Sequence, residues 1–215
     1  MSKASVVKFY SPLEEKINII SHGFGAILSV LALILLVFRS VELGTILHLV
    51  SFSIFGVSLI TLYLASTFYH SATIPKYRLR LKVFDHAAIY ILIAGTYTPI
   101  CLVSLVNTSG WAIFIIAWSC ALAGIVLKLF FTGRFKIIST LLYVMMGWLI
   151  VFFYKDLING LNEDGLFWLF AGGVFYTVGA VLYSIHKLKF NHAIFHVFVL
   201  LGSMSHFVCV YYYVY

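Results

Sequence analysis

Charged residues are scarce in this sequence. Asp, Glu, Lys and Arg make up 10% of the 215 residues, whereas hydrophobic residues make up 63%, and the mean hydropathy is +1.07. A soluble domain carries about 25% charged residues, and a soluble monomer of this size has too much surface to hide so much apolar area. The composition therefore excludes an ordinary cytosolic enzyme and a disordered chain, and it indicates a membrane protein with several spans.

Cysteine and acidic residues are also few. Cys101, Cys120 and Cys209 lie inside apolar runs and form no CxxC pair, which excludes a secreted disulfide scaffold and a cysteine metal site. The 14 Lys and Arg residues exceed the seven Asp and Glu residues and give a net charge of +7. Because these basic residues sit in short gaps between apolar runs, and not on one soluble face, we expect no nucleic-acid partner.

Long apolar runs are what the sequence has in abundance. Seven of them occur, at about residues 17–38, 44–69, 84–105, 110–131, 137–154, 166–185 and 192–214. A bilayer core of about 30 Å needs about 20 residues of helix, and only helices satisfy the backbone of such runs in lipid. We therefore predict an all-α membrane protein, a single seven-transmembrane helix bundle over residues 1–215.

The distribution of Lys and Arg predicts how the bundle is oriented. Twelve of these residues fall at the N-terminus or in alternate gaps, and only Arg39 and Lys155 fall on the other side. The twelve are Lys3, Lys8, Lys16, Lys76, Arg78, Arg80, Lys82, Lys128, Arg134, Lys136, Lys187 and Lys189. The positive-inside rule then predicts a cytoplasmic N-terminus and a C-terminus outside.

Ionisable residues inside the predicted spans gather at one depth. The second span ends at His70, the third begins with Asp85 in its first turn, and the seventh begins with His192 and His196. All of these positions fall at the cytoplasmic side in the predicted topology. Intramembrane ionisable residues are costly and often functional, so we take the four as a candidate site.

The spacing of the histidines favours a metal site. His192 and His196 are four residues apart and share a helix face, and an H-x-x-x-H pair presents two imidazoles to one ion. With His70 they make three imidazole ligands and leave an open position, which is typical of catalytic zinc. Asp85 is then placed to orient or deprotonate a water, and Ser66, four residues before His70, to hydrogen-bond a ligand.

Each of these residues also has a structural interpretation. Asp85 can simply cap its helix, and His22, His48 and His186 are best explained as interfacial or helix-end residues. We expect His206, about 15 Å beyond His196 along the helix, to be a buried hydrogen-bonding residue outside the metal site. Residues 76–82 are predicted to be a solvated loop, and Pro99 is predicted to kink the third span.

Four motifs together resemble a known family. They are Glu14-Glu15-Lys16-Ile17-Asn18 followed by Ser21-His22-Gly23, then Ser66-Thr67-Phe68-Tyr69-His70, Phe84-Asp85-His86-Ala87 and His192-Ala193-Ile194-Phe195-His196. This set is similar to the hemolysin III family, the bacterial branch of the progestin and adipoQ receptors, whose superfamily includes the alkaline ceramidases. The resemblance covers about residues 10–210.

The resemblance implies a multi-pass protein of the plasma (inner) membrane with its N-terminus in the cytoplasm. It implies zinc (Zn²⁺) held by His70, His192 and His196, with Asp85 holding a zinc-bound water. Ser66 belongs to the same constellation and would support the hydrolytic step.

Three functions remain open at this point. The first is a zinc-dependent hydrolase whose substrate is a membrane lipid amide or ester with an acyl chain. The second is a lipid receptor or membrane-homeostasis protein in which zinc is structural, and the third is a cytolysin, which the family name suggests. The chain lacks an amphipathic pore-lining pattern, which disfavours the third.

Overall fold

The computed structural model describes residues 9–131 and 136–215, and helices make up nearly all of this part of the chain, which contains no strand. The elements are α1 (Pro12–Leu43), α2 (Ile46–Ser71), α3 (Pro75–Pro99), the π-helix η1 (Ile100–Ser104), α4 (Gly110–Phe131), α5 (Lys136–Gly147), the 3₁₀-helix η2 (Leu149–Phe153), α6 (Tyr154–Gly160), α7 (Glu163–Ser184) and α8 (Asn191–Tyr213). Within the described residues, seven helical segments are long and apolar enough to cross a membrane. The predicted all-α bundle of seven spans is confirmed.

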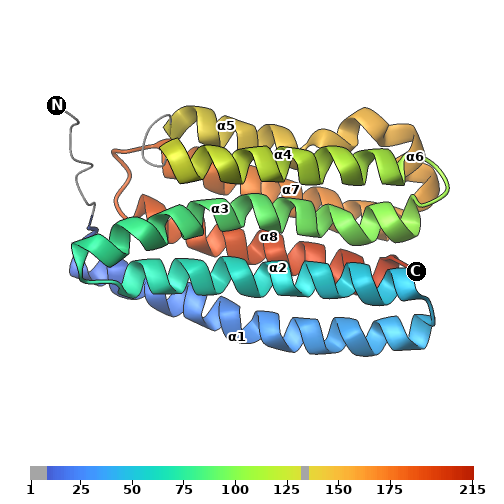
Figure 1. Cartoon of the computed structure of the whole chain (residues 1–215), viewed down its shortest axis with the longest axis horizontal. Helices are drawn as coiled ribbons and strands as arrows, with labels where there is room; N and C mark the ends of the chain where they lie inside the picture. The colour runs from blue at the N-terminus through green and yellow to red at the C-terminus, as the bar shows by residue number, and fades with distance from the viewer. Residues whose placement is uncertain (1–8, 132–135) are drawn as a thin grey trace.

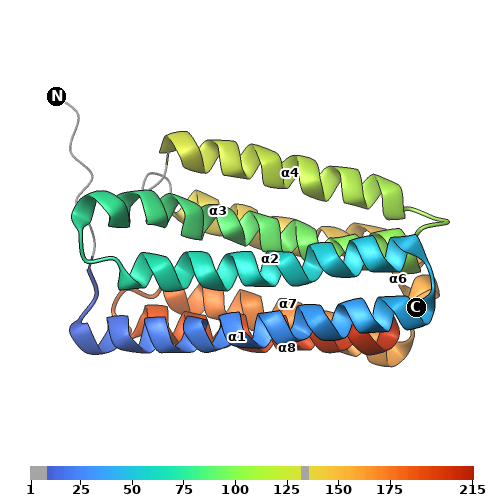
Figure 2. The same ribbon diagram turned by 60° about the horizontal axis from the view of Figure 1, so that its bottom comes forward.

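The helices lie side by side in one bundle (Figure 1). Helix α1 packs against α2 and α8, α2 packs against α3, and α7 packs against α8. In both views α1 and α4 lie on opposite flanks (Figures 1 and 2). Helix α1 begins at one end of the bundle and α8 finishes at the other (Figure 1), as an odd number of spans requires. Which end faces the cytoplasm remains a prediction from the basic residues.

Local sequence signals set the ends of α1. The Ser11 side chain accepts a hydrogen bond from the Glu14 backbone N–H at 3.3 Å, and Pro12 occupies the first turn. Both are favourable at a helix N-terminus. At the other end Gly44 adopts φ 75° and its N–H donates to the Ser40 carbonyl, a left-handed cap that suits glycine. The helix therefore starts five residues before the apolar run and includes Glu14, Glu15 and Asn18.

The third span begins earlier than its apolar run predicts. Helix α3 starts at Pro75, so residues 76–82 are helical and the prediction of a solvated loop there is wrong. Asp85 consequently lies in the third turn and not the first, which also excludes its interpretation as a helix cap. Hydropathy missed this start because the first two turns are basic, whereas proline at the first helical position marks it.

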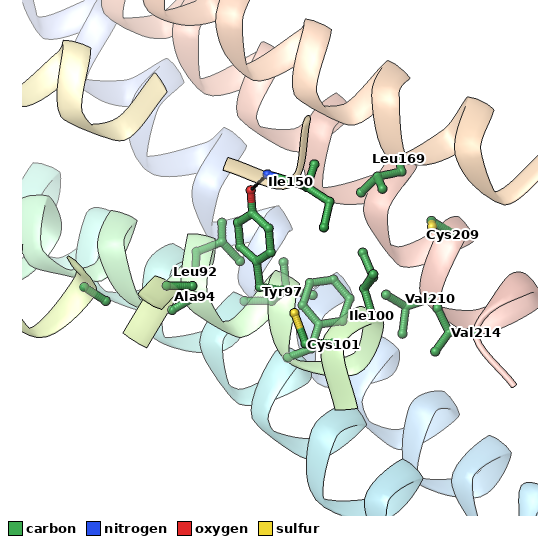
Figure 3. Packing of buried hydrophobic residues seen from close by; sticks show 14 of the residues in the cluster. Leu92, Ala94, Tyr97, Ile100, Cys101, Ile150, Leu169, Cys209, Val210 and Val214 are labelled. Atoms are coloured by element: carbon green, nitrogen blue, oxygen red, sulfur yellow. Dashed lines mark hydrogen bonds between the residues drawn. The ribbon is translucent and has the colours of Figure 1, made fainter. Parts of the chain in front are cut away.

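Two spans are interrupted. The α-helical hydrogen bonding of α3 gives way to a π-helix directly after Pro99, which is a change of helix type, while the predicted kink stays a prediction. The fifth span breaks between α5 and η2, where the Tyr97 hydroxyl donates to the Gly147 carbonyl at 2.8 Å. The same hydroxyl accepts from the Ile150 N–H at 3.1 Å (Figure 3). This hydroxyl satisfies backbone groups that have no water partner in a bilayer.

Candidate metal centre

Three histidines from two helices meet at the end of the bundle where α1 and α8 begin. His70 is in the last turn of α2, and His192 and His196 lie in the first two turns of α8. All three are buried, with exposed fractions of 3%, 6% and 1% respectively. The helical spacing of four residues in α8 turns its two rings to the same side, where the end of α2 brings the third.

The ring nitrogens of these histidines converge on one point. His192 Nε2 lies 3.0 Å from His70 Nε2 and 3.1 Å from His196 Nε2. One ligand atom of each residue lies within 4.8 Å of the others, so the group can hold a metal ion. Zinc–nitrogen bonds of about 2.0–2.1 Å in tetrahedral geometry place ligand nitrogens about 3.3 Å apart. The separations of 3.0 Å and 3.1 Å from His192 Nε2 are close to this value.

A carboxylate fixes the orientation of His70. Its Nδ1 lies 2.6 Å from Glu15 Oε2 on α1. A carboxylate only accepts hydrogen bonds, so Nδ1 carries a proton and Nε2 is the nitrogen that faces the other histidines. Carboxylate–histidine pairs of this kind are the usual outer support of a metal ligand.

A serine performs the same task for His196. The Ser21 hydroxyl donates to the Asn18 carbonyl at 3.1 Å and lies 3.4 Å from His196 Nδ1. Because its proton is directed at the carbonyl, the Ser21 oxygen accepts from Nδ1–H, and Nε2 of His196 is left with a lone pair. The Nε2 atoms of both rings thus face the same region, an arrangement that a cation would stabilise.

Arg78 holds Glu15 in place and was not singled out by the sequence. Its guanidinium is 1% exposed, pairs with Glu15, and donates to the carbonyls of Tyr69, His70 and Ala72 at 3.1–3.2 Å. These carbonyls lie at the end of α2, where carbonyls run out of helical N–H donors, and the Tyr69 carbonyl also accepts from the Ala72 N–H at 3.4 Å. Arg78 therefore links the end of α2 to α1. Its ion pair and its three carbonyl acceptors explain how a basic side chain can be buried at this position.

Aromatic stacking covers two of the rings. His22 on α1 stacks on His196 with ring centroids 3.5 Å apart and planes 8° apart, and Tyr10 stacks on His192 at 4.7 Å. Burial raises the pKa of the Tyr10 phenol above its ordinary value. The expectation that His22 is interfacial is wrong, since the residue is 3% exposed and lies beside the three histidines. In contrast, His48 lies in the first turn of α2, where its backbone N–H donates to the Thr45 side chain that caps the helix, and His186 is exposed, so both are helix-end residues as expected.

A cavity of about 390 Å³ opens beside the histidines. His192, His196, Asp85 and Ser66 line one part of it, and most of the remaining lining is apolar. Asp85 is 7% exposed and Ser66 is 1% exposed. The Ser66 hydroxyl lies close to the Asp85 carboxyl but makes no hydrogen bond within the described residues. The cavity thus joins both predicted catalytic residues to two of the three histidines, while Asp85 stays outside the metal-holding group.

Comparison with known proteins agrees with the motifs. The family described as "Haemolysin-III related" matches residues 10–207. The chain is 48% identical to hemolysin-3 of Bacillus cereus over 94% of its length and 92% of that protein. It is also 48% identical to a hemolysin-3 homolog of Bacillus subtilis, over 93% of its length and 94% of that protein.

A human protein, the monocyte to macrophage differentiation factor, is 29% identical over 75% of this chain and 69% of that protein. The family match spans nearly all seven spans, and the three converging histidines lie inside it. The chain is therefore a membrane protein that belongs to the haemolysin-III-related family.

Proposed function

We propose that this protein is a zinc-dependent hydrolase of a membrane lipid that carries an acyl chain in amide or ester linkage. The observation that carries the proposal is the single cavity that joins His192 and His196 to Asp85, Ser66 and a mostly apolar interior. A metal-holding group, a carboxylate and an apolar chamber in one place are what metal-assisted hydrolysis of a lipid requires.

The donor set supports zinc. His70, His192 and His196 would hold the ion, because neutral imidazole nitrogens suit zinc and suit magnesium and calcium poorly. Three protein ligands leave a fourth position open, which is typical of catalytic zinc, whereas structural zinc has four protein ligands. When bound, zinc supplies Lewis-acid chemistry, which polarises a carbonyl and lowers the pKa of water.

The roles of the other residues follow from their places in the cavity. The Asp85 carboxyl is the general base that orients water and takes its proton, a role that contributes about 10²–10⁴ in rate. The buried Ser66 hydroxyl, which lies close to the Asp85 carboxyl, would turn to donate to a carbonyl oxygen as negative charge develops on it. The apolar lining binds the acyl chain and excludes bulk water.

Lysis of cells is the second candidate, because the Bacillus relatives carry the name hemolysin-3. Lysis by an inserted protein would not depend on Asp85. Lysis that results from lipid hydrolysis would disappear with it, so the same variant separates the two mechanisms.

The test uses purified full-length protein, its metal content, and a panel of ceramide-like and phospholipid substrates, with release of fatty acid as the readout. We expect one zinc per chain and measurable hydrolysis, and we expect Asp85→Asn to keep zinc while losing at least about a hundredfold in rate. A matched control is Asp156→Asn, which changes a carboxylate on α6 that lines no part of the cavity.

Wild-type protein without stoichiometric metal would contradict the proposal. Full zinc occupancy with no hydrolysis of any substrate, or full activity in Asp85→Asn, would favour a receptor or homeostasis role in which the ion is structural. Red-cell lysis that Asp85→Asn leaves unchanged would favour the cytolysin.

A further inference from the structure

His206 lies deep in the bundle, ten residues beyond His196 on α8. It is 8% exposed, and its Nε2 lies 3.1 Å from the Leu169 carbonyl of α7. The expectation of a buried hydrogen-bonding residue is confirmed. This single hydrogen bond uses only one of the two ring nitrogens.

The second nitrogen of His206 has an unmet requirement. Because a carbonyl only accepts, Nε2 is the donor, and in the neutral ring Nδ1 is then an acceptor. Nδ1 is buried, and no donor in the described part of the chain reaches it. Buried polar atoms are nearly always paired, and an exception calls for a ligand or a bound water.

The same ring lines the cavity that holds Asp85, Ser66, His192 and His196. The rise of the helix places His206 about 15 Å from His196 along α8. We propose that the part of the cavity at His206 is a second ligand subsite, in which Nδ1 accepts a hydrogen bond from a hydroxyl carried partway along an acyl chain. The proposal rests on the proposed function, since it requires a chain that enters the cavity from the metal centre.

The packing of α7 builds this subsite. A Cβ on Gly172 would overlap the His206 ring, so the absence of a side chain there lets the imidazole lie against α7 and reach the Leu169 carbonyl. On the other side Tyr176 approaches the ring with centroids 5.4 Å apart, while its own hydroxyl lies 2.8 Å from Ser203 Oγ. The ring is therefore held in place, and its Nδ1 stays unpaired while the neighbouring Tyr176 hydroxyl and Ser203 Oγ bond each other.

Because the acceptor is neutral and lies far from the metal centre, the subsite selects for a hydroxyl group and not for charge. An unsubstituted chain would leave Nδ1 unpaired or leave a water in place, at a cost in affinity. A chain with a mid-chain hydroxyl would supply the missing donor. The ligand class that follows is an amphiphile with its carbonyl at the three histidines and a hydroxyl near the middle of its chain.

The experiment measures equilibrium binding of octadecanoic acid and of the same acid with a mid-chain hydroxyl to the purified protein in nanodiscs. We expect the hydroxylated acid to bind about three- to tenfold more tightly. His206→Phe keeps the ring shape but removes the acceptor, so it should bring the two affinities together. Ser205→Ala is the matched control, because Ser205 is buried on the same turn but bonds its own helix at Leu201 and does not line the cavity.

A comparison of positional isomers tests the same geometry without any variant. An acid with its hydroxyl next to the carboxyl group should bind no better than the unsubstituted acid. Equal binding of all acids by the wild-type protein, or a mid-chain preference that survives in His206→Phe, would overturn the subsite alone. Failure of every acid to bind would overturn the proposed acyl-chain cavity as well, so the two failures are distinguishable.

Discussion

Helix α8 carries histidines in two surroundings that differ in polar support. Near the start of α8, His196 has Ser21 of α1 as a partner. His192 approaches His70, whose partner is the Glu15 carboxylate, also on α1. Ten residues further on, His206 has one backbone carbonyl. A charged and directional support is what a ligand to a cation needs, whereas a neutral acceptor in apolar surroundings suits recognition of a single donor.

The difference has its origin in α1. Glu15, Asn18 and His22 fall on one face of this helix at spacings of three and four residues, and that face packs against α2 and α8. At the first two turns of α8 it supplies polar and aromatic partners to the histidines, namely Ser21 and His22 beside His196. We therefore expect changes at the first pair of histidines to alter metal content and changes at His206 to leave it unaltered.

The largest expected effect is the loss of metal from His196→Ala. Removing one of three ligands should reduce bound zinc from about one per chain to less than a tenth of that in purified protein, because two imidazoles hold zinc weakly. The measurement is elemental analysis after dialysis against metal-free buffer. His206→Phe serves as the comparison and should keep the wild-type zinc content. Equal zinc in the wild type and His196→Ala would show that the three histidines are not the site.

Glu15→Gln should weaken metal binding without abolishing it. The amide still accepts from His70 Nδ1, but the negative charge that supports this ring and pairs with Arg78 is gone. Changes of this kind lower metal affinity about 10- to 100-fold, and competition with a chelator measures the effect. The control is Glu14→Gln, one residue earlier in the same turn, where Oε1 has no hydrogen-bond partner in the described chain. If both variants bind zinc equally well, Glu15 is not a support of His70.

The sequence predicts the spans and the common level of the histidines for simple physical reasons. The length of an apolar run determines whether it crosses a bilayer, and the topology then determines which ends meet. His70, His192 and Asp85 come from three separate runs, yet alternation of direction alone brings them to one end of the bundle. Neither step requires knowledge of how the helices are rotated about their axes.

The supports of the site depend on that rotation and were therefore missed. Arg78 looks like one of several loop cations in the sequence, and only Pro75 signals that it belongs to a helix. His22 looks interfacial because it lies near the start of an apolar run. The signal that would have found Glu15 and His22 is their spacing with Asn18, a polar stripe on one helix face in an otherwise apolar run.

The smallest expected effect concerns the packing that holds His206. It is the difference in stability between Gly172→Ala and Gly173→Ala. Alanine in place of glycine within a helix stabilises it by about 0.5–1 kcal/mol. At Gly173 the new Cβ would meet the Trp148 ring at 3.4 Å, an ordinary contact, so Gly173→Ala should be neutral or slightly stabilising. At Gly172 it would overlap the His206 ring, and overpacking costs about 1–3 kcal/mol.

Gly172→Ala should therefore lower the free energy of unfolding by about 1–2 kcal/mol relative to Gly173→Ala, measured by denaturant titration in the same detergent. Zinc content should not change, because the displaced ring lies three turns from the metal centre along α8. The preference for a hydroxylated chain should fall, since the acceptor would move out of place. A Gly172→Ala protein as stable as Gly173→Ala would mean that the His206 ring shifts freely, and a free ring cannot serve as a fixed point of recognition.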